Sequence, residues 1–464
     1  MEQPNAPTGS FRWDRAAFFA KLQADFAQAK AAGRSETRLL VAQELEAARA
    51  SLEEMLELQH QRRIDHLRLA DLREKVFDLG PAVVAFPDDA PSYLALAEEV
   101  RVAARIVANA EDKRALYTTL YGLRVAVEEV LIAMPEEASK AFEVWTHTAP
   151  PESSNSGVPS AIVNGVYIRS GDMLLSRGGA PTSALIARGS DFPGNFSHVA
   201  LVHVDAQSHA VSVVEAHIER GIAVSAAPEY LGDGKLRILA LRLREDHPAL
   251  AKNRMLPHEV ATAALKEAKE RHVAYDFGMK FADPEKKFCS EVVWAPYNDR
   301  GVDLWHVRST MSDAGVMSWL GSLGVDSFET LAPADLEYDL QLVPCAEWRT
   351  QHSLRQDHID NAVIDGLLWR ADRGLMLAAP WWKWPFAGVA KAYSWLLNRF
   401  GKIGPVPEGM SATVALRVSD LMVRFTIAKM RLTLAVEAFE LREGRFPPVW
   451  DLFEMSKIAV ESDR

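Results

Sequence analysis

The segment KKFCSEVVW, residues 286–294, contains a cysteine between a lysine-flanked polar stretch and a short apolar run. The run continues as SEVVWAPY, which has helical character, so Cys289 is predicted to lie at the start of a helix. A helix N-terminus and nearby cations, here Lys286 and Lys287, both stabilise a thiolate. Cys289 is therefore a candidate nucleophile; the alternatives are a buried packing residue and a metal ligand.

The other cysteine argues against the metal alternative. Cys289 and Cys345 are the two cysteines of the chain, too few for a disulfide scaffold, and their spacing fits no zinc pattern such as Cys-x-x-Cys. We predict no metal and no other cofactor. Cys345 lies in LVPCAEW with no histidine near it in the sequence, and we predict that it is a packed structural thiol.

Composition and charge limit the function classes. The chain has 464 residues, of which 48% are hydrophobic and 25% charged, enough for two or three domains with real cores. The formal net charge of −11 argues against nucleic-acid binding, which needs basic surfaces to neutralise phosphates. We expect no nucleic-acid partner.

The N-terminal sequence bears on localisation. It lacks a basic flank followed by an apolar core, and the chain has no run of about 18 apolar residues. These features predict a cytoplasmic protein without a signal peptide or transmembrane segment. Export by a specialised secretion system, as for an effector, is the alternative if the substrate lies outside the cell.

Residues 1–150 are predicted to form an N-terminal helical region, a hairpin or small bundle. The stretch from Ser35 to Gly80 has a cap signal at its start, apolar residues at spacings of three and four, and a glycine near its end. The bundle is either a solvated structural element or an arm that docks a protein partner.

Residues 160–350 are predicted to form the catalytic domain. The linker TAPPESSNSGVPS, residues 148–160, separates it from the helices. Helices are expected at 182–189 and 256–272. Five short β-branched segments are predicted to be strands of one mostly antiparallel sheet; they are 161–168, 171–178, 197–204, 211–218 and 236–243.

Two of these strands bring a histidine and a carboxylate together. If Val204 faces His209 in an antiparallel hairpin, His198 lies directly opposite Glu215, about 5 Å away between Cβ atoms. A register shift of two residues would keep both on one face, whereas a shift of one would separate them. His217 shares that face and is the reserve candidate for the third position of a Cys–His–acid triad.

The motifs GDMLLSRG, FSHVALV, VVEAHIERGI and YDFGMKF followed by KKFCSEVVWAPY resemble a known family. They are similar to the YiiX/YaeF-like permuted papain-like amidases, a circularly permuted branch of the NlpC-type papain-fold hydrolases. The resemblance covers about residues 160–300. It implies an α+β permuted papain-like domain in which His198 is the base, Glu215 orients it and Cys289 is the nucleophile. Tyr275 and Asp276 match a "YD" segment to which we assign no catalytic role.

The resemblance implies a reaction but leaves the substrate open. We expect a cysteine-dependent hydrolase or acyltransferase that forms an acyl-thioester from an acyl ester or amide, with a phospholipid as the favoured substrate. One alternative is a peptidase or amidase acting on a peptidoglycan stem peptide or an isopeptide bond. Another is a scaffold without activity that binds a partner or a membrane.

Residues 351–464 are predicted to form a C-terminal helical region with a tryptophan-rich segment. Within 375–405, Trp381, Trp382, Trp384 and Trp395 accompany several lysines and arginines. This mixture suits the interface of a membrane, where aromatic rings and cations lie at headgroup level. The alternative is that the rings pack on the catalytic domain or on the N-terminal bundle.

Overall fold

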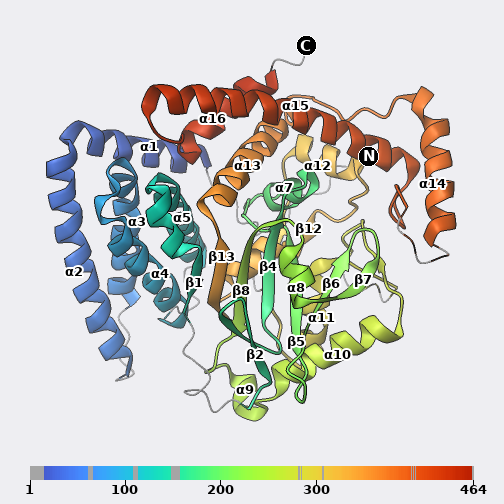
Figure 1. Cartoon of the computed structure of the whole chain (residues 1–464), viewed down its shortest axis with the longest axis horizontal. Coiled ribbons are helices and arrows are strands. Elements are labelled where there is room, and N and C mark those ends of the chain that lie inside the picture. Colours follow the sequence, from blue (N-terminus) through green and yellow to red (C-terminus); the bar gives the residue numbers. More distant parts are fainter. Residues whose placement is uncertain are drawn as a thin grey trace.

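The computed structural model describes residues 15–60, 66–107, 113–147, 157–280, 283, 285–305, 308–398, 400, 402 and 404–461. The fold is α+β, as predicted: a central antiparallel sheet is flanked by helices from both ends of the chain (Figure 1). The predicted linker at 148–160 lies largely outside the described residues, so the boundaries of the three regions stay predictions.

The N-terminal region is helical. Its elements are α1 (Arg15–Ala32), α2 (Arg34–His60), α3 (His66–Ala85), η1 (Pro87–Asp89), α4 (Ala90–Val107), α5 (Lys113–Ala133), α6 (Glu136–Ser139) and η3 (Lys140–Phe142).

Two predicted helix boundaries in this region are wrong. Gly33, with a φ of 85°, separates α1 from α2, so Ser35 falls in the first turn of α2 instead of at its cap. Gly80 lies inside α3, where a Cβ atom would be 2.7 Å from the Cβ of Ala126. The glycine therefore serves the close packing of α3 on α5 and does not end the helix.

The central sheet has seven strands in the order β1-β13-β8-β4-β5-β6-β7, and every neighbouring pair is antiparallel. The strands are β1 (Val144–Thr146), β4 (Met173–Gly178), β5 (His198–Val204), β6 (Val211–His217), β7 (Gly221–Ala226), β8 (Lys235–Leu243) and β13 (Leu342–Arg349). Four of the five predicted segments are strands of this sheet. The sequence analysis did not identify β1, β7 or β13.

The prediction for the fifth segment, 161–168, as a strand of this sheet is wrong. It belongs to a separate hairpin of β2 (Ser160–Val163) and β3 (Val166–Arg169). Asn164 and Gly165, with φ values of 48° and 77°, form the two-residue turn between them. An Asn-Gly pair between β-branched residues favours such a tight hairpin. The prediction of one continuous strand did not take this signal into account.

The remaining elements of residues 160–350 are short strands and helices. Two further pairs of strands are β9 (Ala274–Tyr275) with β10 (Lys286–Lys287), and β11 (Ser309–Thr310) with β12 (Glu329–Thr330). The helices are α7 (Pro181–Arg188), α8 (Ala227–Gly232), α9 (Pro248–Lys252), α10 (Leu256–Glu270), α11 (Cys289–Asn298), α12 (Ala314–Ser322) and η5 (Pro333–Tyr338). Both predicted helices, near 182–189 and 256–272, are present as α7 and α10.

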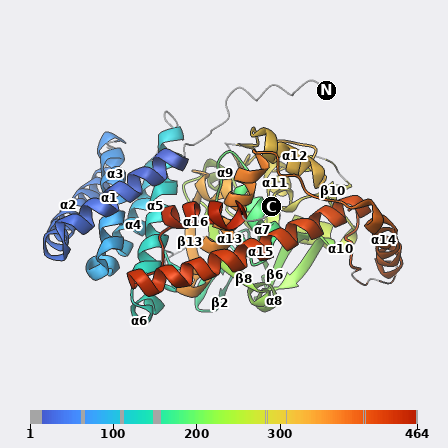
Figure 2. The ribbon, with the colours of Figure 1, turned by 90° about the horizontal axis from the view of Figure 1, so that it is seen from above.

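The C-terminal region is helical and meets the N-terminal region. Its elements are α13 (Gln351–Ala371), η6 (Trp381–Lys383), α14 (Trp384–Asn398), α15 (Ala412–Glu443) and α16 (Val449–Glu461). Rings of α1 pack on α16, with 5.6 Å between the centroids of Phe19 and Phe453. Seen from above, α15 runs along the molecule toward α14 at the end opposite to α2 (Figure 2). In the part of the chain that the structure describes, no helix combines the length and apolar character needed to span a bilayer.

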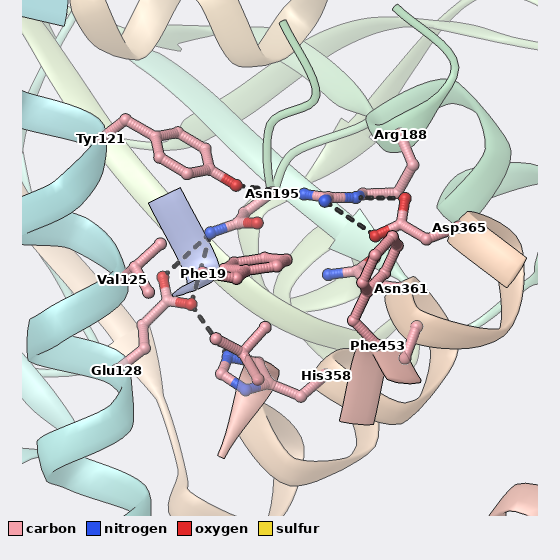
Figure 3. A pocket seen from close by; sticks show the side chains of 12 residues that line it. Phe19, Tyr121, Val125, Glu128, Arg188, Asn195, His358, Asn361, Asp365 and Phe453 are labelled. Carbon is pink, nitrogen blue, oxygen red and sulfur yellow. Dashed lines mark hydrogen bonds and ion pairs between the residues drawn. The ribbon is translucent and has the colours of Figure 1, made fainter. Parts of the chain in front are cut away.

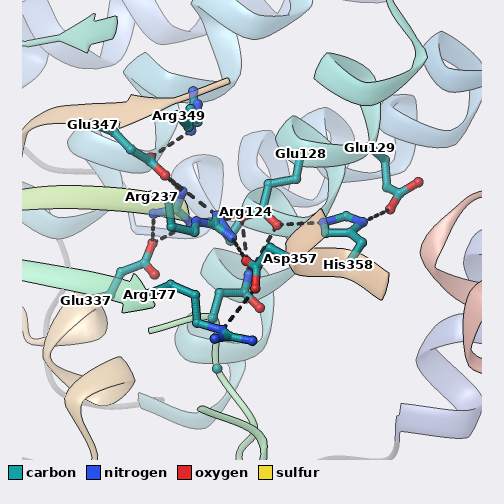
Figure 4. A network of polar contacts seen from close by, with 12 residues as sticks. Arg124, Glu128, Glu129, Arg177, Arg237, Glu337, Glu347, Arg349, Asp357 and His358 are labelled. Carbon is teal, nitrogen blue, oxygen red and sulfur yellow. Dashed lines mark hydrogen bonds and ion pairs between the residues drawn. The ribbon is translucent and has the colours of Figure 1, made fainter. Parts of the chain in front are cut away.

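A buried ionic network joins the three regions (Figure 4). Arg124 of α5 binds Glu347 of β13 at 2.6 Å and Glu337 of η5 at 2.6 Å. Arg237 of β8 binds Asp357 of α13 at 2.9 Å. The guanidinium and carboxylate groups of these five residues are almost fully buried. Because burying a charge is costly unless it is paired, the network requires all three regions to be docked together.

His358 and Glu128 extend this network. Glu128 of α5 also binds Arg237, and its second oxygen lies 3.1 Å from Nε2 of His358. Both residues line a polar cavity of about 20 Å³ where α1, α5, α13 and α16 meet (Figure 3). That volume would hold about one water molecule, so the cavity is too small for a substrate.

Candidate active site

Cys289 is the first residue of α11, as predicted. Phe288 precedes it in an extended conformation, with a φ of −92° and a ψ of 173°. The side chain of Glu291 accepts the backbone N–H of Phe288 at 3.2 Å, which fixes the helix start. Helix α11 packs against β5 and β6, so the thiol is buried on the face of the catalytic hairpin.

His198 and Glu215 lie on that hairpin and contact each other. The Nε2 atom of His198 is 2.8 Å from an oxygen of Glu215. The predicted register, however, is wrong by two residues: Val204 pairs with Val211, not with His209. His198 and Glu215 are therefore diagonal neighbours on one face, which still allows a carboxylate to reach an imidazole.

The loop explains the register. Oδ1 of Asp205 accepts the backbone N–H groups of Gln207 and Ser208 at 3.1 and 2.8 Å. His209, with a φ of 55°, then closes the loop in the left-handed region. The connection consequently contains six residues, 205–210. His209, which was predicted to pair with Val204, lies in this Asp-capped turn and not in a strand.

The electrostatics of the pair depend on Cys289. Burial disfavours the charged imidazolium of His198, but hydrogen bonds to the thiol of Cys289 and to Glu215 outweigh burial and raise its pKa to about 9. Burial likewise opposes ionisation of Glu215, yet hydrogen bonds from His198 and His217 lower its pKa. Since Nε2 faces Glu215, Nδ1 is the ring atom left to exchange a proton with Cys289.

Glu215 is held by two further side chains. Nε2 of His217 lies 3.1 Å from Oε1 of Glu215, and the hydroxyl of Ser225 donates to the same oxygen at 3.3 Å. His217, the reserve candidate, is thus placed on the carboxylate. Ser225 was missed, because it lies on β7, a strand that the sequence analysis did not identify.

The predicted cations are less important than expected. Lys287 forms an ion pair with Glu267 of α10 at 2.7 Å, so its charge is neutralised locally. Strand β10, which contains Lys286 and Lys287, pairs with β9 and brings Tyr275 near Cys289. Burial, and then the nearby thiol, raise the pKa of Tyr275 well above its usual value.

Asp276 shapes the loop that follows Tyr275. Its carboxylate accepts the backbone N–H groups of Gly278 at 2.9 Å and Lys280 at 2.7 Å. These contacts are structural and hold the loop beside the cavity described next. They give Asp276 no contact with Cys289 or His198.

A large apolar cavity of about 390 Å³ lies next to neighbours of the candidate site, although Cys289, His198 and Glu215 are not among the residues that line it. Tyr275, which shares an apolar cluster with Cys289, lines one side, together with Ile218, the residue after His217. Parts of the C-terminal region close the other side: the 405–410 segment and the first turns of α15. The cavity is therefore built jointly by the catalytic domain and the C-terminal helices.

Cys345 lies in a different environment. It is fully buried in β13, and burial raises the pKa of its thiol to about 12. Such a thiol is protonated at neutral pH and is a poor nucleophile. Across the described residues, no group of three or more His, Cys, Asp or Glu side chains is arranged to hold a metal ion.

Comparison with known proteins identifies the central region. Residues 167–342 match the family described as permuted papain-like amidase enzyme, YaeF/YiiX, C92 family. The match confirms the predicted resemblance and extends beyond residue 300, where the predicted similarity ended. Comparisons with curated proteins and with solved structures gave no match.

Proposed function

From the match of residues 167–342 to the permuted papain-like amidase family, C92, we propose that the protein is a hydrolase whose nucleophile is Cys289. His198 takes the proton of the thiol, and Glu215 orients the imidazole and stabilises its charge. The observation that carries the proposal is geometric: Nε2 of His198 lies 2.8 Å from Glu215 on the pair of strands against which α11, with Cys289 at its start, is packed.

The reaction proceeds in two balanced steps. The Cys289 sulfur attacks an acyl carbonyl, and the backbone N–H of Cys289, in the first turn of α11, helps to stabilise the oxyanion. The tetrahedral intermediate collapses to an acyl-thioester while the His198 imidazolium protonates the leaving alcohol or amine. His198 then deprotonates a water molecule, which hydrolyses the thioester and restores the thiol. An alcohol or amine acceptor in place of water would make the same step an acyl transfer.

The cavity favours a substrate with an apolar acyl group. Its volume of about 390 Å³ falls within the range of about 300–1,000 Å³ usual for small-molecule sites. Its lining is mainly aliphatic and aromatic, from residues such as Ile186, Leu320, Val325 and Met422. We therefore propose an acyl ester or amide with an aliphatic chain, a phospholipid in the first instance.

A second candidate is an amide of the bacterial cell wall or an isopeptide. The amidase description of the family favours an amide bond. The apolar cavity distinguishes the two candidates, because a stem peptide offers few groups that would fill it.

The test is mass spectrometry of a total phospholipid extract after incubation with the protein, with a peptidoglycan digest treated in parallel. We expect lyso-lipid and free fatty acid with the wild type and neither with Cys289→Ala. Altered muropeptides with unchanged lipids would replace the lipid proposal by the amidase. If a thiol-directed alkylating probe reacts with Cys289 no faster than with Cys345 near neutral pH, the domain is a scaffold without activity.

A further inference from the structure

Helix α14 lies at one end of the molecule (Figures 1 and 2). It exposes many large apolar side chains. We define the α14 surface as the side chains of η6, α14 and the following turn that are 48–78% exposed. They are Trp381, Trp382, Trp384, Phe386, Val389, Tyr393, Trp395, Leu396 and Phe400. The alternative prediction, that these tryptophans pack against the rest of the protein, is wrong for all four.

The inner face of α14 has the opposite composition. Its buried residues, Ala387 and Ser394, are small. They are seven positions apart and therefore lie on the same face of the helix. A helix on a globular protein usually buries its large apolar side chains and exposes polar ones. Here the arrangement is reversed, and contiguous apolar surface of this kind marks an interaction site.

The charged residues within the segment itself have one sign. No acidic residue occurs between Asp372 and Glu408, whereas Lys383, Lys391 and Lys402 lie in that interval. The ammonium of Lys383 lies 5.1 Å from the ring centroid of Trp382. The whole chain has a net charge of −11, so this basic and aromatic patch contrasts with the rest of the protein and complements an anionic surface.

The α14 surface is tied to the rim of the apolar cavity. The backbone N–H of Val406 donates to the hydroxyl of Ser394 at 2.8 Å, and the ammonium of Lys391 donates to the carbonyl of Met410. Pro405 and Met410, which adjoin these contacts, line the cavity. A partner bound at α14 would therefore lie next to the opening into which a substrate chain enters.

We propose that the α14 surface docks on an anionic phospholipid bilayer and places the cavity rim at the membrane. Tryptophan and tyrosine rings concentrate at the headgroup level, and lysines near an anionic membrane are attracted to it. An acyl chain then passes from the bilayer between the 405–410 segment and α15 into the cavity. This last step rests on the proposed function, whereas the docking itself does not.

The experiment measures flotation of the full chain with vesicles, in a Cys289→Ala background so that no lipid is consumed. We expect flotation with phosphatidylcholine vesicles containing 30% phosphatidylglycerol, and weaker flotation in high salt. The triple variant Trp381→Ala/Trp384→Ala/Phe386→Ala should bind at least tenfold more weakly. Leu434→Ala/Leu441→Ala, which removes exposed side chains of α15, is the matched control and should bind like the parent.

The outcomes separate the two proposals. Equal flotation of the triple variant and the parent, or no flotation of either, would overturn the docking. If the wild type nevertheless releases fatty acid from detergent-dispersed phospholipid, the proposed function stands without it. Sedimentation experiments test whether the chain self-associates as its concentration rises. If it does, if the triple variant abolishes this association, and if no vesicle binding is seen, the surface binds a second copy of this chain and the proposal is overturned.

Discussion

His198 and His358 make similar contacts in two different regions of the molecule. Each contacts glutamate through Nε2, and each has a pKa raised to about 9 because contacts with neighbouring side chains outweigh burial. His358 lies between Glu128 and Glu129 inside the interface of the three regions. His198 has one glutamate and, on its other side, Cys289.

The difference shows what turns a buried ion pair into a reactive group. Carboxylates lie 3.1 and 3.2 Å from the two ring nitrogens of His358, so its imidazolium forms ion pairs on both sides and holds helices together. Replacing one of them by a thiol gives His198 a partner that can exchange a proton with it. A raised histidine pKa alone thus does not identify a catalytic site; the identity of the second partner does.

The largest expected effect separates the two cysteines. Cys289→Ala should lower turnover by about 10³-fold or more, because it removes the nucleophile of both steps. Cys345→Ala should retain turnover. Steady-state rates on the substrate found by mass spectrometry, with circular dichroism to verify folding, check this. Full activity of Cys289→Ala would remove the proposed mechanism.

The second effect is on the stability of the network around His358. Arg237→Met should destabilise the protein by about 3–5 kcal/mol, because it removes a guanidinium that pairs with the buried carboxylates of Glu128 and Asp357. Arg34→Met is the control, since its exposed ion pair with Asp88 should contribute little to stability. Urea denaturation measures both; equal losses would show that the network does not hold the regions together.

The third effect is the pH dependence of stability. A histidine whose folded-state pKa is raised from 6.5 to about 9 contributes about 3 kcal/mol below pH 6.5, and loses it as the pH rises through about 9. His358→Asn should therefore be less stable than the wild type at pH 6 and nearly equal to it at pH 10, with turnover retained.

His198→Asn is the counterpart in the site, and it should lower turnover by about 10²–10⁴-fold. Denaturation curves at several pH values and rates at pH 7 are compared for both variants. If His358→Asn lost turnover to the same extent as His198→Asn, the contrast between the two histidines would be incorrect.

The smallest effect concerns Glu215→Gln. The amide keeps an acceptor for His198 but removes the negative charge, so the pKa of His198 should fall below about 9. We expect about a tenfold loss of turnover, which corresponds to about 1.4 kcal/mol of transition-state stabilisation. NMR titration of the imidazole of His198 measures the pKa; an unchanged midpoint would show that Glu215 positions the ring without stabilising its charge.

Much of the candidate site follows from local sequence patterns. Side chains of a strand point to alternate faces, which predicts that His198 and Glu215 share one face. An error of two residues in the register leaves this prediction unchanged, because the orientation repeats every second residue. The helix start at Cys289 was equally local. Ser225 was not predictable in this way, because its role depends on the pairing of β6 with β7.

Contacts over long sequence separations explain the other omissions. Arg124 meets Glu347 across 223 residues, and no local pattern identifies such partners. The composition of the tryptophan-rich segment was evident from the sequence. The exposure of its tryptophans was not, because it depends on α14 packing through its small residues. Which side of a helix faces the protein is decided by packing, not by composition.

The ionic network also has a consequence for synthesis of the chain. Arg124 is made about 213 residues before its partner Glu337, and a ribosome adding about 5–20 residues per second needs about 10–40 s for that interval. During this time the face of α5 that carries Arg124 and Glu128 remains uncovered on the nascent chain. The ionic network therefore cannot form until β13 and α13 have been made.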